Sequence, residues 1–374
     1  MNNKIKVCFP FVGNSIGGSH ISTLELISSL DKNLFDIIIV LHKKGDLFNY
    51  LRKKKIKFFY FPVFKFIGQE KGYVNNFFIL LKSFFQIIRF IKFQKIHILH
   101  TNDASIHLTW SLPVKFPKCK LVWHQRIKYP QWRMYKFFSF FSDQIICISN
   151  YVLKSLPNNL KHKAKVIYNP ISLVDRDNNK EEKKKLQKII RIKKKKILFL
   201  ANIIKSKRID IFIKSAFLIY KKNHNCIFLV IGSDKLGIFK KFLKNFKVNN
   251  NFKKKIFFLD QCFSIKSWLK ICDILLVPAV NEGYNRTIVE SLLAKLPVIV
   301  SDSGGHKEVI MKSKILFVNP NDYHNFALKT LNFLKLNKNQ SKFIINKQMR
   351  TIKIRHNNKI IKEKIQKIYR NINK

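Results

Sequence analysis

Short, nearly unbroken apolar runs alternate along the chain with longer segments in which apolar residues recur every three or four positions. The first pattern is typical of parallel strands covered on both faces, and the second is typical of helices that pack on such a sheet. The first half therefore predicts a doubly wound α/β domain. Its expected strands are 4–12, 35–41, 57–62, 96–100, 120–123, 144–148 and 164–167, and its expected helices are 19–30, 45–54, 75–92, 105–113 and 150–156.

The alternation stops in a polar, lysine-rich stretch and then begins again. We interpret the stretch as a linker with the approach helix of a second doubly wound domain, because few of its positions could bury a face. In that domain we expect strands at 197–201, 226–231, 255–258, 274–278 and 297–301, and helices at 208–220, 235–246, 265–271 and 287–295. The predicted organisation is an N-terminal domain over 1–172, the linker over 173–196, a C-terminal domain over 197–340 and a basic helical tail over 341–374.

Two spaced carboxylates mark the most informative stretch of the second half. Glu282 follows the apolar run 274–280, and Glu290 lies eight positions later in a helical pattern that stops at Pro297. For an isolated pair, surface charge is the simpler interpretation. Here, however, the backbone N–H groups of 283–287 lie at the positive end of the expected helix, which favours a phosphate. Carboxylates accept vicinal hydroxyls, so the stretch fits a ligand that is both phosphorylated and hydroxyl-rich.

The same stretch resembles the donor-binding signature of the family 4 (group 1) glycosyltransferases. That signature is an EGFG loop, an apolar helix with a second Glu, an LPVIV strand and a GG-x-x-E turn. This chain departs from it at Asn285, where the family usually has a second glycine, and at Lys295, where it often has glycine. The matching positions are Glu282, Gly283, Tyr284, 287–290, 296–300, Gly304, Gly305 and Glu308.

The resemblance implies the GT-B fold, in which two Rossmann-like domains face each other across a cleft and the C-terminal helix crosses back to the first domain. It also implies a reaction that moves a sugar from a nucleotide diphosphate donor to a hydroxyl of a glycan or lipid-linked acceptor. Family members retain the anomeric configuration and serve, among other pathways, bacterial surface polysaccharide synthesis. Neither a cofactor nor a metal is expected.

By resemblance, the donor-side residues take separate roles. Glu290 binds the donor ribose, Lys207 binds the diphosphate, and Glu282 contacts the sugar. Asn202 stands where an arginine is common, and Arg208 stands where glycine is common; Lys205 or Arg286 are the candidates to replace the missing arginine. The loop and helix start that complete the expected donor site are Gly283, Tyr284, Asn285, Arg286 and Thr287.

In the first half, two glycines and a histidine follow strand ends. Gly17 and Gly18 lie between the first expected strand and its helix, where they allow close approach of an anionic or sugar ligand. They resemble the glycine loop that lies across the cleft from the donor in the family. His124 matches a family histidine near the transferred sugar, so we expect it to orient sugar or acceptor. His100 ends the preceding strand, and for it we prefer a structural role.

Charge is the anomaly of the composition. The chain has 73 Lys and Arg against 21 Asp and Glu, a net charge of +52, which suggests nucleic acid or an anionic membrane as a partner. The lysines are dispersed through both domains, so we expect no nucleic acid. Abundant Lys, Ile, Asn and Phe together also indicate AT-rich coding bias. The candidate membrane contact is 65–95, with Phe77, Phe84, Phe85 and Phe90 toward lipid and Lys82, Arg89 and Lys92 toward headgroups; packing of this helix on the sheet is the alternative.

Other features narrow the setting. The six cysteines lie mostly in strand-like runs without C-x-x-C spacing, so we expect reduced core thiols. The first residues lead directly into a strand, which predicts a cytoplasmic protein, held peripherally at the inner membrane if the charge is functional. Asp175 and Asp177 form the D-x-D spacing that holds a metal in glycosyltransferases of another fold, but their polar linker setting favours chance.

The sequence thus predicts a retaining, nucleotide-sugar-dependent glycosyltransferase. Two alternatives remain open at this point. A nucleotide-sugar epimerase of the same architecture would fit the two domains, although the E-x7-E context matches it less well. A non-enzymatic protein that binds nucleic acid or membrane would explain the net charge of +52.

Overall fold

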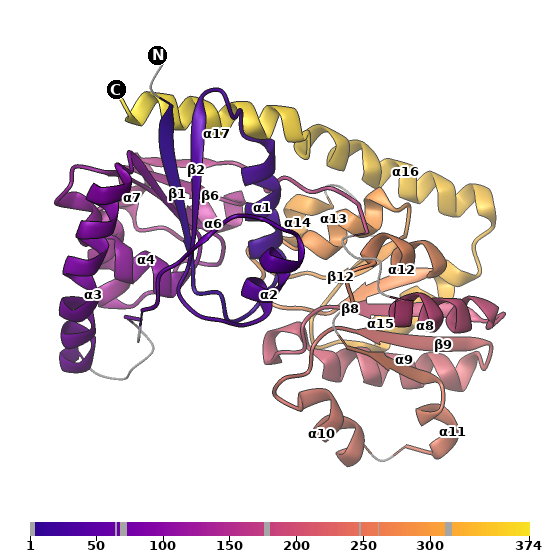
Figure 1. Cartoon of the computed structure of the whole chain (residues 1–374). Helices are drawn as coiled ribbons and strands as arrows, with labels where there is room; N and C mark the ends of the chain where they lie inside the picture. The colour runs from indigo at the N-terminus through magenta and orange to yellow at the C-terminus, as the bar shows by residue number, and fades with distance from the viewer. Residues whose placement is uncertain are drawn as a thin grey trace. The chain divides into compact units, whose positions relative to one another are not determined.

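The computed structural model describes residues 4–63, 66–67, 73–175, 180–246, 248–260, 262–310 and 316–374. The chain forms two compact units. The first unit comprises Met1–Pro170 and His356–Lys374, and the second comprises Ile171–Arg355. The stretch expected as one tail is therefore divided: α16 (Lys338–Arg355) belongs to the second unit and α17 (Asn358–Ile372) to the first (Figure 1).

The first unit is built on a parallel sheet of seven strands in the order β3-β2-β1-β4-β5-β6-β7. The strand order reverses between β1 and β4, as in a dinucleotide-binding fold. Most of these strands are buried along their length, which explains their unbroken apolar sequences. The strands are β1 (Ile5–Phe11), β2 (Phe35–Leu41), β3 (Phe59–Tyr60), β4 (Ile98–Thr101), β5 (Lys120–Gln125), β6 (Gln144–Cys147) and β7 (Ala164–Val166).

Alternate residues of these strands pack on helices at one face of the sheet. Val7 and Phe9 of β1 form a core with α1, α2 and α17, to which the last helix contributes Ile361, Ile365 and Tyr369. At another part of the unit, α4 packs against both α3 and α5. The helices are α1 (Gly18–Ser29), α2 (Asp46–Lys53), α3 (Tyr73–Gln94), α4 (Ala104–Trp110), η1 (Pro113–Lys115), α5 (Arg133–Phe140), α6 (Asn150–Lys154) and α7 (Asn158–Lys161).

The second unit repeats this topology with six parallel strands in the order β10-β9-β8-β11-β12-β13. Here the order reverses between β8 and β11. One core contains strand residues such as Phe199 and Phe228 together with Phe212 of α9 and Phe326 of α15. The strands are β8 (Lys195–Leu200), β9 (Cys226–Ile231), β10 (Ile256–Leu259), β11 (Ile274–Val277), β12 (Val298–Ser301) and β13 (Phe317–Val318).

The helices of the second unit include the charged segment that the sequence suggested as a linker with an approach helix. It forms α8, which packs on α12, while α16 packs on α13. Glu182 of α8 accepts hydrogen bonds from the Trp268 indole and from the Ser264 amide at the start of α12. These buried hydrogen bonds fix the charged helix against α12. The helices are α8 (Lys180–Arg191), η2 (Lys205–Lys207), α9 (Ile209–Lys222), α10 (Ile238–Asn245), α11 (Asn250–Lys253), α12 (Ile265–Ile271), α13 (Arg286–Leu293), α14 (His306–Val309) and α15 (Tyr323–Leu334).

The predicted fold class, two doubly wound α/β units, is confirmed. The last helix also packs in the first unit, as the resemblance implied. The sequence patterns missed α5, α15 and β13, together with the short helices α7, α11 and α14. No helix among the described residues is long and apolar enough to cross a membrane. All six cysteines are free, and four of them are buried.

Candidate active site

The two candidate residues Lys207 and Glu282 meet where the second sheet reverses its strand order. Lys207 follows β8 and Glu282 follows β11, and these strands are neighbours in the sheet. Loops after such a pair of strands run in opposite directions, which is where ligands bind in open α/β sheets. Lys207 Nζ lies 2.7 Å from Glu282 Oε1, with about a fifth of each side chain exposed. A cation and a carboxylate are therefore held together at the expected position of the donor.

The backbone beside Lys207 carries strain that its neighbours offset. Arg208 has a φ of 54°, in the left-handed region, at the position where the family commonly has glycine. Its guanidinium forms an ion pair with Asp210 at 3.1 Å and donates to Asn321 Oδ1 at 2.8 Å. The Ser206 carbonyl accepts from the Val280 amide at 2.8 Å, which ties this turn to the end of β11. The turn is thus fixed without glycine.

A second glycine turn supports the loop that carries Glu282. Gly304 has a φ of 60°, and a Cβ added there would lie 2.4 Å from the Glu282 carbonyl oxygen. A Cβ at Gly305 would lie 2.2 Å from the Gly283 carbonyl oxygen, while the Gly305 amide donates to the Glu282 carbonyl at 2.8 Å. Only glycine allows this approach. Gly304 and Gly305 of the signature therefore support the candidate donor loop by packing directly against its backbone.

Asn285, the departure from the family pattern, caps the helix that follows. Its Oδ1 accepts from the Ile288 amide at 3.4 Å, and its amide nitrogen lies 3.5 Å from His306 Nε2. His306 is fully buried and its Nδ1 lies 3.0 Å from the Ser301 carbonyl. Burial lowers the pKa of His306, so the ring is neutral and donates through Nδ1 to that carbonyl. Asn285 thus stands where the family usually has glycine, and its side chain connects the start of α13 to His306 after the glycine turn.

Glu290 lies on α13 and is paired with Arg286 of the same helix. Arg286 Nε donates to Glu290 Oε1 at 2.9 Å, and both side chains are less than a tenth exposed. Four residues apart on a helix, the two side chains share one face. The buried pairing means that Arg286 stays at Glu290 rather than at the position of the missing family arginine. Asn202 and Lys205 are exposed, whereas Tyr284 is buried and Thr287 is half-buried.

In the first unit, the glycine loop is closed by a side chain of its own helix. The Gly17 amide donates to His20 Nδ1 at 3.0 Å, and His20 follows in the first turn of α1. Burial lowers the pKa of His20 to about 4, which keeps this acceptor neutral. The Gly17 N–H group is therefore already used within the chain, and the Gly17 carbonyl accepts from the Ile21 amide at 3.1 Å. Gly18 begins α1 and is exposed.

His124 lies in a buried polar cluster at the carboxyl end of β5. Arg126 donates to Asn102 at 2.8 Å, to Asn169 at 2.6 Å and to Thr23 at 2.9 Å. Arg126 Nη2 also lies 3.3 Å from His124 Nδ1. His124 is only 2% exposed. The cluster gathers residues from α1, the ends of β4 and β5 and the loop after β7, so the sheet topology brings together side chains that are distant in sequence.

The D-x-D spacing lies partly outside the described residues, since Asp177 is not among them. Asp175 accepts from the Ser267 amide at 3.0 Å and from its hydroxyl at 2.7 Å, at the start of α12. No three His, Cys, Asp or Glu side chains among the residues that the structure describes are grouped as a metal ion would require. Asp175 thus has a structural contact of its own.

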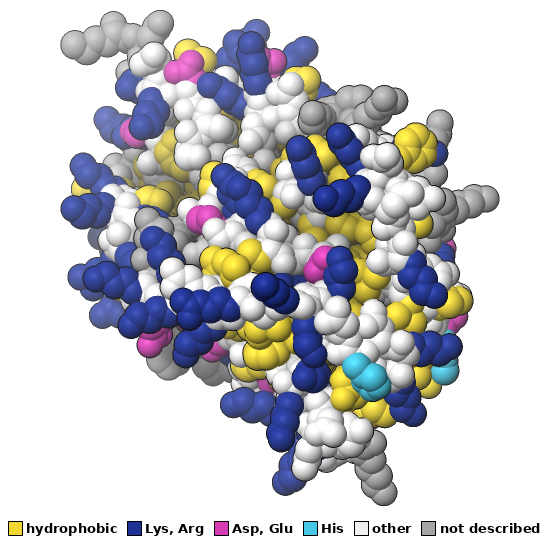
Figure 2. Space-filling model, turned by 90° about the vertical axis from the view of Figure 1, so that its right-hand side faces the viewer, with side chains coloured by type: hydrophobic (Ala, Val, Ile, Leu, Met, Phe, Trp, Pro, Cys, Tyr) yellow, Lys and Arg dark blue, Asp and Glu magenta, His cyan; other side chains and the backbone are white. Residues whose placement is uncertain are grey.

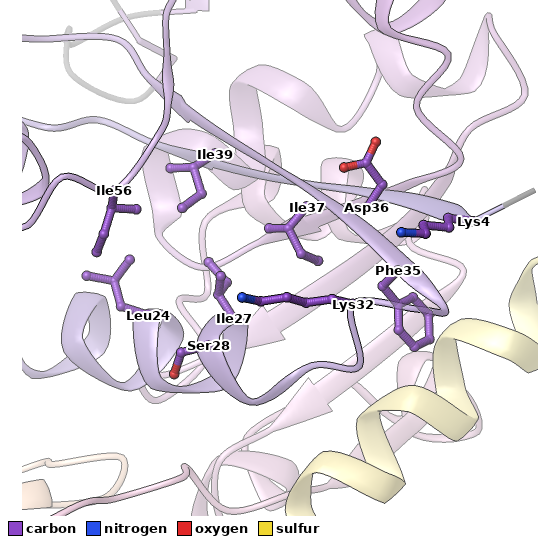
Figure 3. A pocket seen from close by; sticks show the side chains of 10 residues that line it. All are labelled: Lys4, Leu24, Ile27, Ser28, Lys32, Phe35, Asp36, Ile37, Ile39 and Ile56. Carbon is purple, nitrogen blue, oxygen red and sulfur yellow. The ribbon is translucent and has the colours of Figure 1, made fainter.

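A cavity of about 660 Å³ lies in the first unit, between α1 and β2 (Figure 3). Lys4, Phe35 and Asp36 line it at the amino ends of the strands, with Lys32 and Ile27 beside them. The candidate residues of this unit follow the carboxyl ends of β1 and β5 instead. Because these are opposite edges of a parallel sheet, the cavity is not the expected ligand site.

His306, Arg126 and Tyr369 are among the residues of these clusters that were not identified from the sequence. His306 falls inside the glycine turn of the signature, and Arg126 lies two residues after His124, so both had a local signal. Tyr369 had none, because its contact with His100 joins residues 269 positions apart. Sequence reasoning identified the two loops of the candidate donor site, and it missed the contacts that hold the candidate residues in place.

Comparison with known proteins agrees with these observations. Residues 180–350 match the family profile described as Glycosyl transferases group 1, and residues 16–174 match Glycosyltransferase Family 4. An uncharacterised glycosyltransferase of Methanocaldococcus jannaschii is 30% identical over 202 residues, 53% of this chain and 52% of that protein. The chain thus matches about half the length of this relative.

A longer match is to UDP-Gal:α-D-GlcNAc-diphosphoundecaprenol α-1,3-galactosyltransferase of Escherichia coli, 22% identical over 330 residues, 82% of this chain and 81% of that enzyme. Among solved structures, the Anabaena protein HepE in complex with UDP and glucose gives a TM-score of 0.77 at 14% identity, over 97% of this chain and 99% of that chain. This likeness shows the fold. The two profile matches together cover most of the chain, which belongs to the family 4, group 1 glycosyltransferases.

Proposed function

We propose that this protein transfers a sugar from a nucleoside diphosphate sugar to a hydroxyl of a glycan or lipid-linked acceptor, with retention of the anomeric configuration. The observation that carries the proposal is the Lys207–Glu282 ion pair at the strand-order reversal of the second sheet. In this proposal the ammonium serves the diphosphate, and the carboxylate beside it serves the sugar hydroxyls. The related fold of HepE was solved with UDP-glucose, which supports the donor class.

Lys207 and the start of α13 supply the positive charge that a leaving diphosphate needs. Lys207 exchanges its contact with Glu282 for a phosphate oxygen when the donor binds, and the freed carboxylate accepts hydroxyls of the sugar. Preorganised cations and helix N–H groups stabilise developing phosphate charge without a metal. We therefore propose no metal and no cofactor.

Once the donor is bound, the freed Glu282 carboxylate accepts sugar hydroxyls, so we do not assign it as the nucleophile of a covalent sugar intermediate. We propose instead that the acceptor attacks the same face that the diphosphate leaves, and that the departing phosphate oxygen takes the acceptor's proton. The bond from the anomeric carbon to phosphate breaks as the bond to the acceptor oxygen forms.

The donor test is a thermal shift panel of nucleoside diphosphate sugars on the full chain. A ligand at 100 times its dissociation constant stabilises by about 2.7 kcal/mol, which a panel resolves easily. The stabilising donor is then incubated with diphosphopolyprenol-linked sugars, and the anomeric proton coupling of the product is read by NMR. Donor epimerisation or hydrolysis without acceptor would contradict transfer, and an inverted coupling would contradict retention.

We also propose that the acceptor is lipid-linked, within bacterial surface polysaccharide synthesis, and that the protein binds the cytoplasmic face of the inner membrane. The galactosyltransferase relative is named for a diphosphoundecaprenol-linked acceptor. On α3, Phe78, Phe85 and Phe93 are 62%, 65% and 84% exposed, and Arg89 and Lys92 are exposed beside them. Such a helix suits an anionic lipid surface.

The structure corrects part of the expected membrane face. Phe84 contacts the Phe116 ring at 5.0 Å, and Phe90 contacts Phe61 at 5.1 Å, so these two side chains pack within the protein. Phe77 and Lys82 have side chains outside the described residues. Figure 2 shows Lys and Arg side chains scattered over one whole face rather than gathered in a tract, which argues against a nucleic-acid groove there.

Co-sedimentation with vesicles tests the membrane contact. Vesicles containing anionic lipid should bind the protein at low ionic strength and release it at high salt, because headgroup attraction is screened. Phe85→Ser with Phe93→Ser should weaken binding, whereas Phe343→Ser, which removes an exposed aromatic from the second unit, should not. Failure to bind anionic vesicles at low salt would leave a soluble enzyme with a soluble acceptor.

A further inference from the structure

Three buried side chains of the first unit form a hydrogen-bonded chain that ends at His124. The Tyr369 hydroxyl of α17 lies 2.5 Å from His100 Nδ1, and His100 Nε2 lies 2.9 Å from His124 Nδ1. Tyr369 and His100 are fully buried, and His124 is 2% exposed. A residue of the last helix is therefore connected, through one ring, to the histidine expected near the transferred sugar.

Both histidines are neutral at ordinary pH. Burial, reinforced by the charge of Arg126, lowers the pKa of His100 and of His124 well below the usual value. Burial raises the pKa of Tyr369, so its hydroxyl keeps its proton. Each neutral ring then has one N–H donor and one acceptor nitrogen. Only two directions of the chain are possible under these conditions.

Arg126 decides between them because a guanidinium is always a donor. Its Nη2 lies 3.3 Å from His124 Nδ1, so that nitrogen presents its lone pair and the His124 proton is on Nε2. His100 then donates through Nε2 to His124 and accepts the Tyr369 hydroxyl proton at Nδ1. The reverse direction would place a His124 Nδ1–H group against the Arg126 cation.

The free end of this chain is the His124 Nε2 atom. It is buried, and no partner for it lies within hydrogen-bond reach among the residues that the structure describes. A buried N–H group without an acceptor carries a desolvation cost, so such groups in folded proteins call for an explanation in terms of water, a ligand or function.

We propose that Arg126, His100 and Tyr369 are positioning residues that lock His124 as a hydrogen-bond donor through Nε2, directed at an oxygen of the bound ligand. The inference rests on the proposed function only for the identity of that oxygen, a hydroxyl of the sugar or of the acceptor. Since the Nδ1 lone pair accepts from His100 and faces the Arg126 cation, His124 does not take a proton from the acceptor. Its contribution is orientation and charge stabilisation.

The direct test is the tautomeric state of the histidines in the full-length protein without ligand. In ¹⁵N-histidine NMR, long-range couplings distinguish the protonated ring nitrogen from the bare one. We expect His100 and His124 both to carry their proton on Nε2, with signals assigned by His100→Gln and His124→Gln. A His124 proton on Nδ1 would overturn the inference and leave the transferase proposal untouched. If no donor supported transfer, the transferase proposal would be overturned. The tautomers could still be measured, and they would still test the inference.

Two tyrosine variants separate positioning from packing. Tyr369→Phe removes the donor to His100, so the His100 Nδ1 resonance should shift and kcat should fall several-fold with little change in KM for the donor. Tyr135→Phe is the matched control, because Tyr135 is also fully buried and its hydroxyl bonds Gln125 at 2.9 Å. It should leave the His100 signals and kcat unchanged. Equal losses of kcat in both variants would contradict a positioning role.

Replacement of His124 itself provides a check on the active nitrogen. The Gln side-chain amide reaches the place of Nε2, whereas that of Asn reaches the place of Nδ1. We expect His124→Gln to retain at least tenfold more kcat than His124→Asn, with both proteins folded by circular dichroism. Better rescue by Asn would show that Nδ1, not Nε2, contacts the ligand, and would overturn the inference.

Discussion

The two units share a sheet topology but treat buried polarity in different ways. At the carboxyl ends of the first sheet, histidines and amide side chains surround the Arg126 cation, and burial keeps the histidines neutral. At the corresponding edge of the second sheet, charges are matched in two ion pairs, Lys207 with Glu282 and Arg286 with Glu290. The first edge therefore holds several histidines whose protonation would disturb it, whereas the second edge, with His306 as the one buried histidine of its unit among the described residues, relies mainly on charge pairing.

This difference predicts different weaknesses. A network held neutral by burial is disturbed when its rings gain protons, so the first unit should be sensitive to acid. A buried ion pair is disturbed when one partner is removed, because the other loses its compensation. The second unit should therefore respond more strongly to a single charge-removing substitution than to a change in pH.

The largest effect is expected from Glu290→Gln in the second unit. The substitution takes the carboxylate from Arg286 inside the protein, and loss of one partner of a buried pair costs about 3 kcal/mol. It should also weaken binding of the nucleoside diphosphate, if Glu290 contacts the ribose. Denaturant unfolding and calorimetric titration measure the two effects.

Asp302→Asn is the control for that prediction, because the Asp302–Lys307 pair in the same unit is largely exposed. Exposed pairs contribute at most about 1 kcal/mol, so its unfolding midpoint should barely change. Similar destabilisation by both substitutions would show that the burial of the Arg286–Glu290 pair does not matter.

Acid should destabilise the first unit before the second. Burial lowers the pKa of His42 from 6.5 to about 4. Between pH 6.5 and pH 4 the unfolded chain therefore binds a proton at this residue that the folded chain does not bind. Stability is complete above pH 6.5 and falls as the pH approaches 4, by about 2 kcal/mol for this residue at pH 5. His20 acts in the same sense. Asp103 opposes them, since burial raises its pKa to about 6.

Hydrogen exchange at pH 7 and pH 5 distinguishes the units, once intrinsic exchange rates are corrected. Opening free energies of amides in β2 and β4 should fall, while those in β9 and β11 should change much less. His42→Gln should reduce the difference between the two pH values. An equal decrease in both sheets would contradict the comparison.

Glu282→Gln tests the second ion pair through the reaction. The amide still accepts one hydrogen bond but loses the charge that holds sugar hydroxyls, so kcat should fall about tenfold, or about 1.4 kcal/mol in barrier. Affinity for the free nucleoside diphosphate should hardly change, because Lys207 remains. Steady-state kinetics and titration measure both. Equal loss of diphosphate affinity in the Glu282 and Glu290 variants would contradict their separate roles.

The smallest effect is expected at the D-x-D spacing. Asp175→Asn with Asp177→Asn should leave turnover unchanged, and turnover should persist in EDTA. Stability should fall by no more than about 1 kcal/mol, because Asp175 contributes hydrogen bonds to Ser267 at the start of α12. Loss of activity on chelation, restored by manganese or magnesium, would show that a metal is needed.

Sequence patterns predicted most of the fold because parallel strands covered on both faces must be apolar. β2 and β9 begin and end at the expected residues. α15 was missed because polar residues such as His324, Asn325 and Lys329 interrupt its apolar positions. α5 was missed because its dense aromatics obscure the helical period. Local pattern is a weak guide where polar or aromatic residues occupy both faces.

The candidate site also has features that the sequence predicted and features that it did not. The donor loop is local in sequence, so the spacing of Glu282 and Glu290 predicted one carboxylate on the loop and one on the helix, which is where the structure places them. Their partners were not predicted, since the contact of Lys207 with Glu282 depends on β8 and β11 being neighbours in the sheet. In the first unit nearly every contact of His124 arises from the fold rather than from neighbouring residues.

The position of α17 has a consequence for synthesis. The core of the first unit contains Val7 and Phe9 from the start of the chain and Ile361 and Ile365 from α17, separated by the whole second unit. On the ribosome, the second unit has all of its residues before the first unit has α17. Until α17 has been synthesised, the apolar face that α17 covers in the first unit stays exposed. An apolar face of this kind is a target for chaperones.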